Sequence, residues 1–173
     1  MSWQVPGNDS DLSVGEMRIE RLMDAISDST SQVPTGTGVV NAIGINFGDA
    51  ITHSNYTLDA NGKLTILTTG MYRLKLAIQF GRDTNAQIAR LLFRVVVDGV
   101  QAGRSVSVFL NNESDRQYIE NDNWVNITAG TEIEYQVMRD SGGVNSGGLF
   151  ATSPTDSAWN NAPSASLRLE RFI

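Results

Sequence analysis

The stretch that decides the fold is Gly70-Met71-Tyr72-Arg73-Leu74-Lys75-Leu76-Ala77-Ile78-Gln79-Phe80. Its side chains alternate in character with a period of two. One set of alternate positions is aromatic or aliphatic: Tyr72, Leu74, Leu76, Ile78 and Phe80. The positions between them include Arg73, Lys75 and Gln79. This alternation predicts a β-strand with one face on a hydrophobic core and the other face turned outward.

Similar segments lie on both sides of this strand, and turn residues separate them. The expected strands are 39–47, 56–58, 63–67, 91–97, 106–110, 124–127, 133–137, 149–152 and 165–173. Asn61-Gly62 and Asp98-Gly99 are the dipeptides that tight hairpins prefer, because both tolerate positive φ. About eight to ten strands with no helix between them predict an all-β, antiparallel jelly-roll sandwich over residues 39–173.

Residues 1–38 are predicted to form an N-terminal arm with a short helix and a hinge. Ser13 and Glu16 have the spacing of a capping box. An apolar stripe with helical spacing follows: Ile19, Leu22, Met23 and Ile26. The helix is expected over roughly 14–27. Since so short a helix is marginal alone, the stripe must dock, either on its own sandwich, on a neighbouring subunit or host scaffold, or in a three-helix bundle. Trp3 is expected to insert into another subunit.

The composition excludes several classes of protein. There is no cysteine, which rules out disulfides and thiolate metal sites. No run of 18 apolar residues and no signal peptide are present, so we expect folding in a cytoplasm. The net charge of −6 argues against nucleic acid or an anionic membrane as partner. Charged residues make up only 18%, below the usual ~25%, as expected of a surface that meets protein.

No catalytic set is recognisable, so we expect a protein that is not an enzyme and has no cofactor or metal. The one histidine, His53, lies in a polar loop far from any nucleophile motif. Four carboxylates close in sequence offer hard oxygen ligands that suit Ca²⁺: Glu113, Asp115, Glu120 and Asp122. Their spacing matches no calcium loop, and we interpret them as an exposed acidic loop.

Two further features have a functional and a structural interpretation. Trp159 lies in a polar loop, where it either contacts a receptor glycan or protein, or plugs the end of the sandwich. Arg73 and Lys75 lie on one predicted strand, and Glu132 and Glu134 lie on another. These opposite charges either pair across the sheet or between subunits, or remain solvated.

The block from Tyr56 to Leu74 resembles the trimeric jelly rolls of the tumour-necrosis-factor and complement type. The resemblance rests on a short apolar strand that is followed by Gly70-Met71-Tyr72-Arg73-Leu74. The turn Val97-Asp98-Gly99, the segment 125–130 and the penultimate aromatic Phe172 follow in the same order, although Thr131 replaces an acidic residue of the family. The resemblance spans 39–173 and implies a homotrimer. It places Tyr72, Tyr135 and Phe172 on or beside the sheet at the trimer axis.

Such jelly rolls occur in signalling ligands, spore-coat filaments, phage fibre heads and phage decoration proteins. We therefore expect a virion structural protein, specifically a homotrimeric capsid decoration (cement) subunit that binds the major capsid protein. The alternative is a tail-fibre or receptor-binding head that presents the loops near 111–122 and 141–159. An enzyme is disfavoured because the inward positions of the strands are apolar rather than paired carboxylates.

Overall fold

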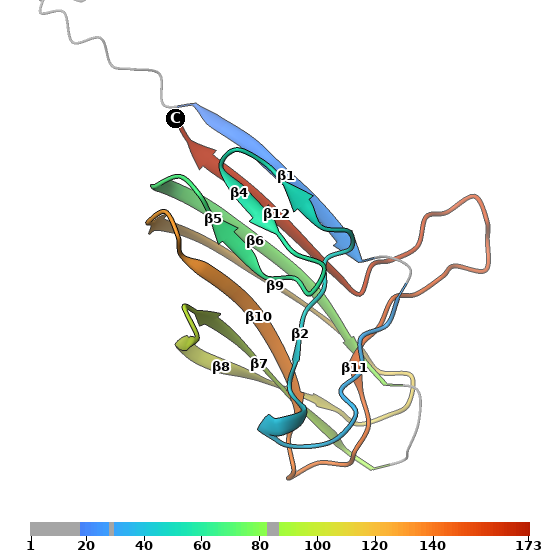
Figure 1. Ribbon diagram of the computed structural model, residues 1–173. Coiled ribbons are helices and arrows are strands. Elements are labelled where there is room, and N and C mark those ends of the chain that lie inside the picture. Colours follow the sequence, from blue (N-terminus) through green and yellow to red (C-terminus); the bar gives the residue numbers. More distant parts are fainter. Residues whose placement is uncertain (1–17, 28–29, 83–86) are drawn as a thin grey trace, which may run out of the picture.

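The computed structural model describes residues 18–27, 30–82 and 87–173. These residues form two antiparallel sheets that face each other (Figure 1). The elements are β1 (Ile19–Ser27), a 3-10 turn η1 (Val39–Asn41), β2 (Ile43–Gly44), β3 (Ile51–Thr52), β4 (Tyr56–Leu58), β5 (Leu64–Ile66), β6 (Gly70–Gly81), β7 (Ala89–Val97), β8 (Val100–Leu110), β9 (Arg116–Ile127), β10 (Glu132–Arg139), β11 (Gly148–Leu149) and β12 (Ala165–Phe172).

Strands distant in the sequence are neighbours in both sheets. In the first sheet, called sheet A, the order is β1-β12-β6-β11, and β9 pairs with the other side of β6. In sheet B the order is β3-β4-β5-β10-β7-β8, and β2 pairs with β10. All named pairings are antiparallel, and the chain crosses repeatedly between the sheets. The prediction of an all-β jelly-roll sandwich is confirmed.

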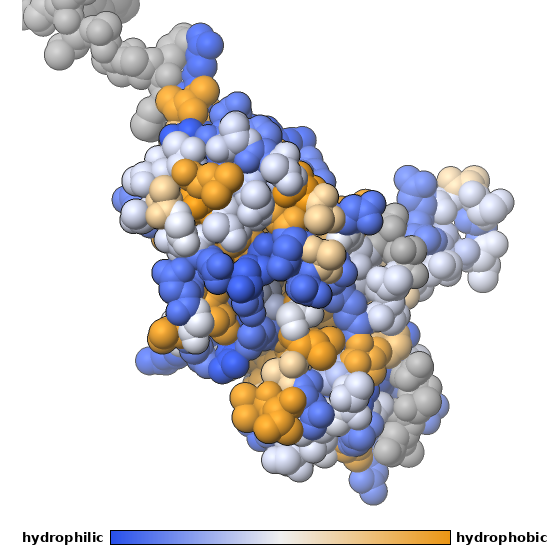
Figure 2. Space-filling view, viewed as in Figure 1, coloured by the Kyte–Doolittle hydropathy of each residue, from blue (hydrophilic) through white to orange (hydrophobic). Residues whose placement is uncertain are grey.

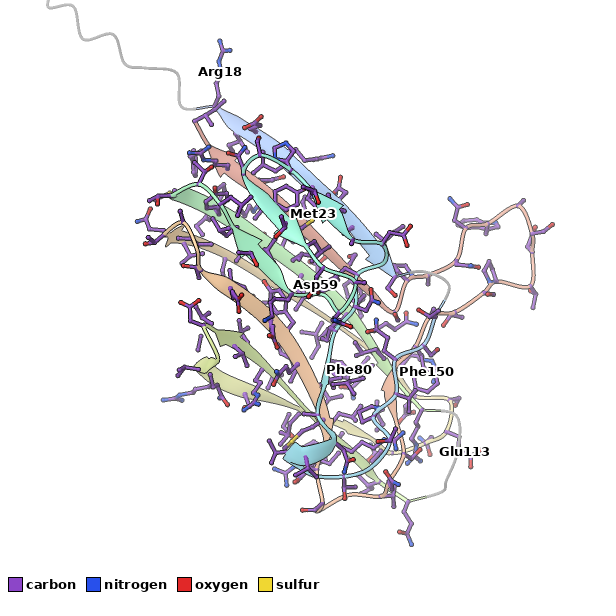
Figure 3. The ribbon with its side chains drawn as sticks, viewed as in Figure 1. Arg18, Met23, Asp59, Phe80, Glu113 and Phe150 are labelled. Carbon is purple, nitrogen blue, oxygen red and sulfur yellow. The ribbon has the colours of Figure 1, made fainter. Side chains whose placement is uncertain are left out.

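The hydrophobic core lies between the two sheets, and every second side chain of β6 points into it. The apolar side chains of β6 from Tyr72 to Phe80 are between 0 and 7 % exposed. The ring of Tyr135, from sheet B, meets Phe47 edge-on at 5.9 Å and stacks on Phe93 at 6.2 Å. Phe80, which Figure 3 labels, is fully buried in this core. Burying one such side chain contributes roughly 1.5–3 kcal/mol, so this face of β6 stabilises both sheets.

The predicted helix over 14–27 is wrong for the described part of that range. Residues 19–27 form β1, which pairs with β12 from Ile19↔Phe172 to Ser27↔Ala165. The apolar stripe does not lie on one face of the strand, because Met23 is buried while Ile19 and Ile26 are exposed on the outer face. A register shift between Arg21 and Met23 changes which residues face inward along β1. Met23 is buried between the sheets (Figure 3). Pairing with β12 satisfies the backbone along the whole segment, which a marginal helix would not do as well. Positions 14–17 and Trp3 lie outside the described residues.

The predicted strand over 39–47 is also wrong in its first part. Residues 39–41 form the turn η1 after Gly38, whose φ of 82° favours glycine. Further along, the side chain of Gln32 holds the segment to the sandwich. Its Nε2 donates to the carbonyl of Asn46 at 2.9 Å, and its Oε1 accepts from the Asn46 N–H at 2.7 Å. Within the described ranges, no helix is long and apolar enough to cross a membrane.

Candidate interaction surfaces

The three residues that the resemblance places at the trimer axis lie in different surroundings. Tyr72 is fully buried between the sheets, and its hydroxyl donates to the carbonyl of Thr68 at 2.5 Å. Tyr135 is also buried, and burial raises the pKa of its phenol. Phe172 is only half-buried, and its ring lies 4.5 Å from that of Trp124. Of the three, Phe172 alone is available to a partner.

The outer face of sheet A carries a ladder of ion pairs. Arg73 donates to both carboxylate oxygens of Asp122, at 2.8 and 2.7 Å, and to Glu170 at 3.2 Å. Lys75 lies 3.5 Å from Glu120. Hydrogen bonding from Arg73 holds the pKa of Asp122 below its usual value. These pairs are partly exposed and contribute little to folding by themselves, but they fix the charge pattern that a partner would meet.

One of the alternatives for Arg73, Lys75, Glu132 and Glu134, their pairing across one sheet, is wrong. The two strands belong to different sheets, β6 to sheet A and β10 to sheet B. Glu132 and Glu134 instead contact Lys63, with its Nζ 3.0 Å and 3.5 Å away.

Apolar side chains flank the ladder on the same outer face. Four of them are 40–63 % exposed: Ile19, Met71, Trp124 and Tyr118. Between Ile26 of β1 and Tyr118 of β9 lies a shallow groove of about 280 Å³. Its lining includes the small residues Ala77 and Ser166, so the sheet surface is low there and can receive side chains from another molecule.

The sandwich is open along the side where β8 and β9 form the sheet edges. The register with β6 places Asn121, Asn123 and Val125 on the inward face of β9. Asn123 and Val125 are nevertheless exposed, Val125 by 40 %. On the facing strand, Val106 is 38 % exposed. A single chain therefore leaves part of its own interior uncovered along this side.

Trp159 projects from the molecule rather than plugging its end, so that alternative is wrong. It is 74 % exposed in a loop that extends away from the sheets between β11 and β12 (Figure 1). The bridge Thr152↔Ala162 closes the base of the loop. Near its tip, Asp156 accepts from the N–H groups of Trp159 at 3.1 Å and Ala158 at 2.9 Å. The loop thus presents one large aromatic ring to solvent.

The candidates for metal binding have other roles. Asp115 closes a turn by accepting from the N–H groups of Asn111 and Asn112, which lowers the pKa of its carboxyl. Glu120 and Asp122 are not in a loop but on β9. In the ranges 18–27, 30–82 and 87–173, no three potential metal ligands of the His, Asp or Glu type come together.

His53 also has a structural role. Its ring stacks on that of Tyr56, with centroids 5.1 Å apart. Its Nδ1 accepts from the N–H of Asn55 at 3.2 Å. The side chain therefore shapes the turn between β3 and β4.

Comparison with known proteins identifies the fold. No protein-family model matches the sequence, and no curated protein matches it. The solved structure of Eiger TNF from S. frugiperda is similar, with a TM-score of 0.50 and 9% sequence identity. The match covers 91% of this chain and 92% of that one. The chain therefore has a tumour-necrosis-factor-like jelly-roll fold, and the resemblance seen in the sequence is confirmed at the level of the fold.

Proposed function

We propose that this chain is a non-enzymatic structural subunit that works as a homotrimer. The supporting observation is the open side, where the inward-facing residues of β8 and β9 remain exposed in a single chain. Apolar surface of this kind is stabilised when another molecule covers it. Val106 and Val125 supply that apolar surface, and the side-chain amides of Asn121 and Asn123 supply hydrogen bonds.

The partner surface is the outer face of sheet A of the next copy. Its groove has the small residues Ala77 and Ser166 in the lining and would receive side chains of a neighbour's β9. An edge that meets a different face is a head-to-tail contact, and such contacts close into a ring when the rotation allows. Three copies would then bury both surfaces of every chain. A stable contact of this type buries roughly 800 Å² per partner.

Measurement of the mass in solution tests this proposal. We expect three chains for the natural sequence, and single chains for Ala77→Arg, because the larger side chain fills the groove. The matched control is Val40→Asp, on the outer side of sheet B, which is expected to remain trimeric. A natural protein that stays monomeric at high micromolar concentration would refute the homotrimer.

The finer assignment that we propose is a phage capsid decoration subunit located on the virion, with the major capsid protein as its partner. The sequence supports it through the low share of charged residues, 18%, and the absence of cysteine. A cement protein acts by binding across neighbouring shell subunits, which stabilises the assembled state by mass action. Addition of the trimer to undecorated shells should raise their temperature of rupture. An unchanged temperature, with no protein bound to the shells, would contradict this assignment.

The alternative is a receptor-binding or tail-fibre head, and the exposed Trp159 is the observation that favours it. Loops on a rigid sandwich commonly carry binding residues, and a solvent-facing tryptophan is a frequent binding hot spot. Binding to a glycan array or to host cells that Trp159→Ala abolishes, in a protein that is still trimeric, would favour this function. Binding that Trp159→Ala leaves unchanged would count against it.

A further inference from the structure

The outer face of sheet B has an apolar hollow on the side away from the proposed trimer contacts. Its volume is about 90 Å³, roughly three water volumes and enough for one aliphatic side chain. Its apolar lining comes from three elements and one connecting segment: Val39, Ala42, Leu92, Phe93, Val137 and Met138. Beside it, η1 exposes Val39 by 62 % and Val40 by 88 %. Figure 2 shows apolar surface gathered over η1 at the lower end of the molecule.

The polar lining of the hollow contains one charged side chain, that of Arg94, and this charge is positive although the protein as a whole carries a charge of −6. Arg94 donates from Nε and one Nη to the side-chain oxygen of Gln136, at 2.9 and 2.7 Å. In the described part of the chain Arg94 has no carboxylate within ion-pair distance, and the nearby Glu134 pairs with Lys63. The hollow therefore suits an apolar side chain with a carboxylate next to it.

Residues 1–17 of this chain have that chemistry. The segment contains Asp9, Asp11 and Glu16 and no lysine or arginine. Leu12 directly follows Asp11, so an aliphatic side chain and a carboxylate are adjacent. We propose that the N-terminal segment of one copy binds the sheet B hollow of a neighbouring copy, with Leu12 in the hollow and Asp11 beside Arg94. This contact links copies independently of the proposed trimer interface.

Chain length excludes the hollow of the same copy. Six residues from Leu12 to Arg18 span at most about 21 Å. Arg18 bonds to Ile173 at the end of the sandwich where β10 begins, since β9 ends there at Ile127. Met138, which lines the hollow, lies six residues further along β10, about 20 Å away. The path must also pass around a second sheet ~10 Å distant, so Leu12 reaches the hollow only from another copy.

Cysteine cross-linking tests this contact, because the natural chain has no cysteine. One preparation of the full chain carries Ser13→Cys, next to Leu12, and another carries Ser105→Cys at the edge of the hollow. Mixed and oxidised, they should give at least tenfold more disulfide-linked heterodimer than Ser13→Cys mixed with Ser153→Cys. Ser153 is exposed in the Trp159 loop and serves as the control position.

Two further variants identify the contact chemistry. Leu12→Ser, added to the Ser13→Cys chain, should reduce the cross-link to the control level. Arg94→Glu in the Ser105→Cys chain should reduce it at least fivefold, and Asp11→Lys in the other chain should restore it. Equal cross-linking at Ser105 and Ser153, or no restoration by the charge exchange, would overturn the proposal.

The solution mass of each variant separates this contact from the proposed trimer. A trimer without the cross-link to Ser105 would refute the N-terminal contact and leave the trimer standing. Cross-linking in a protein whose subunits are otherwise monomeric would refute the trimer alone.

Discussion

Strands β8 and β9 are both edges of their sheets, but only one of them is interrupted. Along β7 and β8 the register shifts, so that Phe93 faces Val106 while Val95 faces Ala102. Three residues of β8, 103–105, thus stand opposite Arg94 alone. Strand β9 pairs with β6 without any shift, from Gly70↔Ile127 to Gly81↔Arg116.

This difference in regularity between β8 and β9 indicates which edge strand is suited to contact a partner. Bulges and inserted charges blunt an edge against pairing with another chain, and β8 has both, since Arg104 lies in its bulge. A long regular edge such as β9 is the kind of surface that natural proteins cover. The proposed trimer covers β9 and the open side next to it.

The largest expected effect is on the free energy of unfolding, and it tests how much of the core β8 covers. Leu110 is fully buried at the end of β8, whereas Val106 is 38 % exposed on the open side. Leu110→Ala should lower the free energy of unfolding by about 2–5 kcal/mol, because it leaves a cavity. Val106→Ala should lower it by less than about 1 kcal/mol. Urea unfolding at a concentration where the chain is monomeric measures both, and equal losses would show that the side is not open.

The second effect compares the two edges as interaction surfaces. Val125 of β9 and Val100 of β8 are both exposed, by 40 % and 71 %. A lysine at Val125 would have to desolvate its charge in the proposed trimer, so Val125→Lys should weaken association by about 2 kcal/mol, roughly thirtyfold. Val100→Lys should leave it unchanged. Sedimentation equilibrium measures both, and a larger effect at Val100 would mean that β8 is the contact edge.

The third prediction tests the backbone of the bulge. Gly103 has a φ of 69°, and a Cβ at that position would meet no atom within 4 Å. Gly103→Ala should therefore cost only the conformational penalty of positive φ, about 1 kcal/mol. Gly103→Asn should cost less, since asparagine tolerates this region. Thermal unfolding compares the two, and equal stability of alanine and asparagine would show that the bulge relaxes.

The same comparison explains what the sequence could predict. Strand β6 is packed on one face along its whole length, so its apolar alternation was a sufficient signal. The sequence predicts only the end of β9, at Trp124–Ile127, as a strand, because residues 116–123 are polar apart from Tyr118 and Ile119 and show no alternation. That polarity is a consequence of the open side, where the inward positions Asn121 and Asn123 are not buried by the chain itself.

For β1 the sequence pattern predicts the wrong element, because its apolar residues have helical spacing although the segment is a strand. A bulge between Arg21 and Met23 shifts the inward positions by one residue. Met23 faces the core, whereas Ile19 and Ile26 face outward and are more than half exposed, so their helical spacing comes from residues on both faces of the strand. Only the register with β12, a strand more than a hundred residues away, decides between a helix and a strand, and no local pattern contains that register.

The smallest expected effect is the loss, at low pH, of the stability that the ion pairs between β6 and β9 contribute to the folded chain. Arg73 holds the pKa of Asp122 below its ordinary value of 3.8. A carboxyl with a lowered pKa in the folded state stabilises the protein above about pH 4 and loses that contribution as the pH falls through the folded pKa. The Asp122→Asn variant lacks the contribution, so its melting temperature should be lower than that of the natural chain at pH 7. The two melting temperatures should converge below pH 3.

The difference at pH 7 should be no more than about 2 °C, because both partners are one-third exposed and solvent screens such pairs. Asp49→Asn, at an exposed position outside the ladder, is the control for a general charge effect. A difference for Asp122→Asn that stays constant from pH 7 to pH 2.5 would show that the Arg73–Asp122 pair does not stabilise the folded chain. The unbroken edge of β9 would then owe its geometry to its backbone pairing with β6 alone.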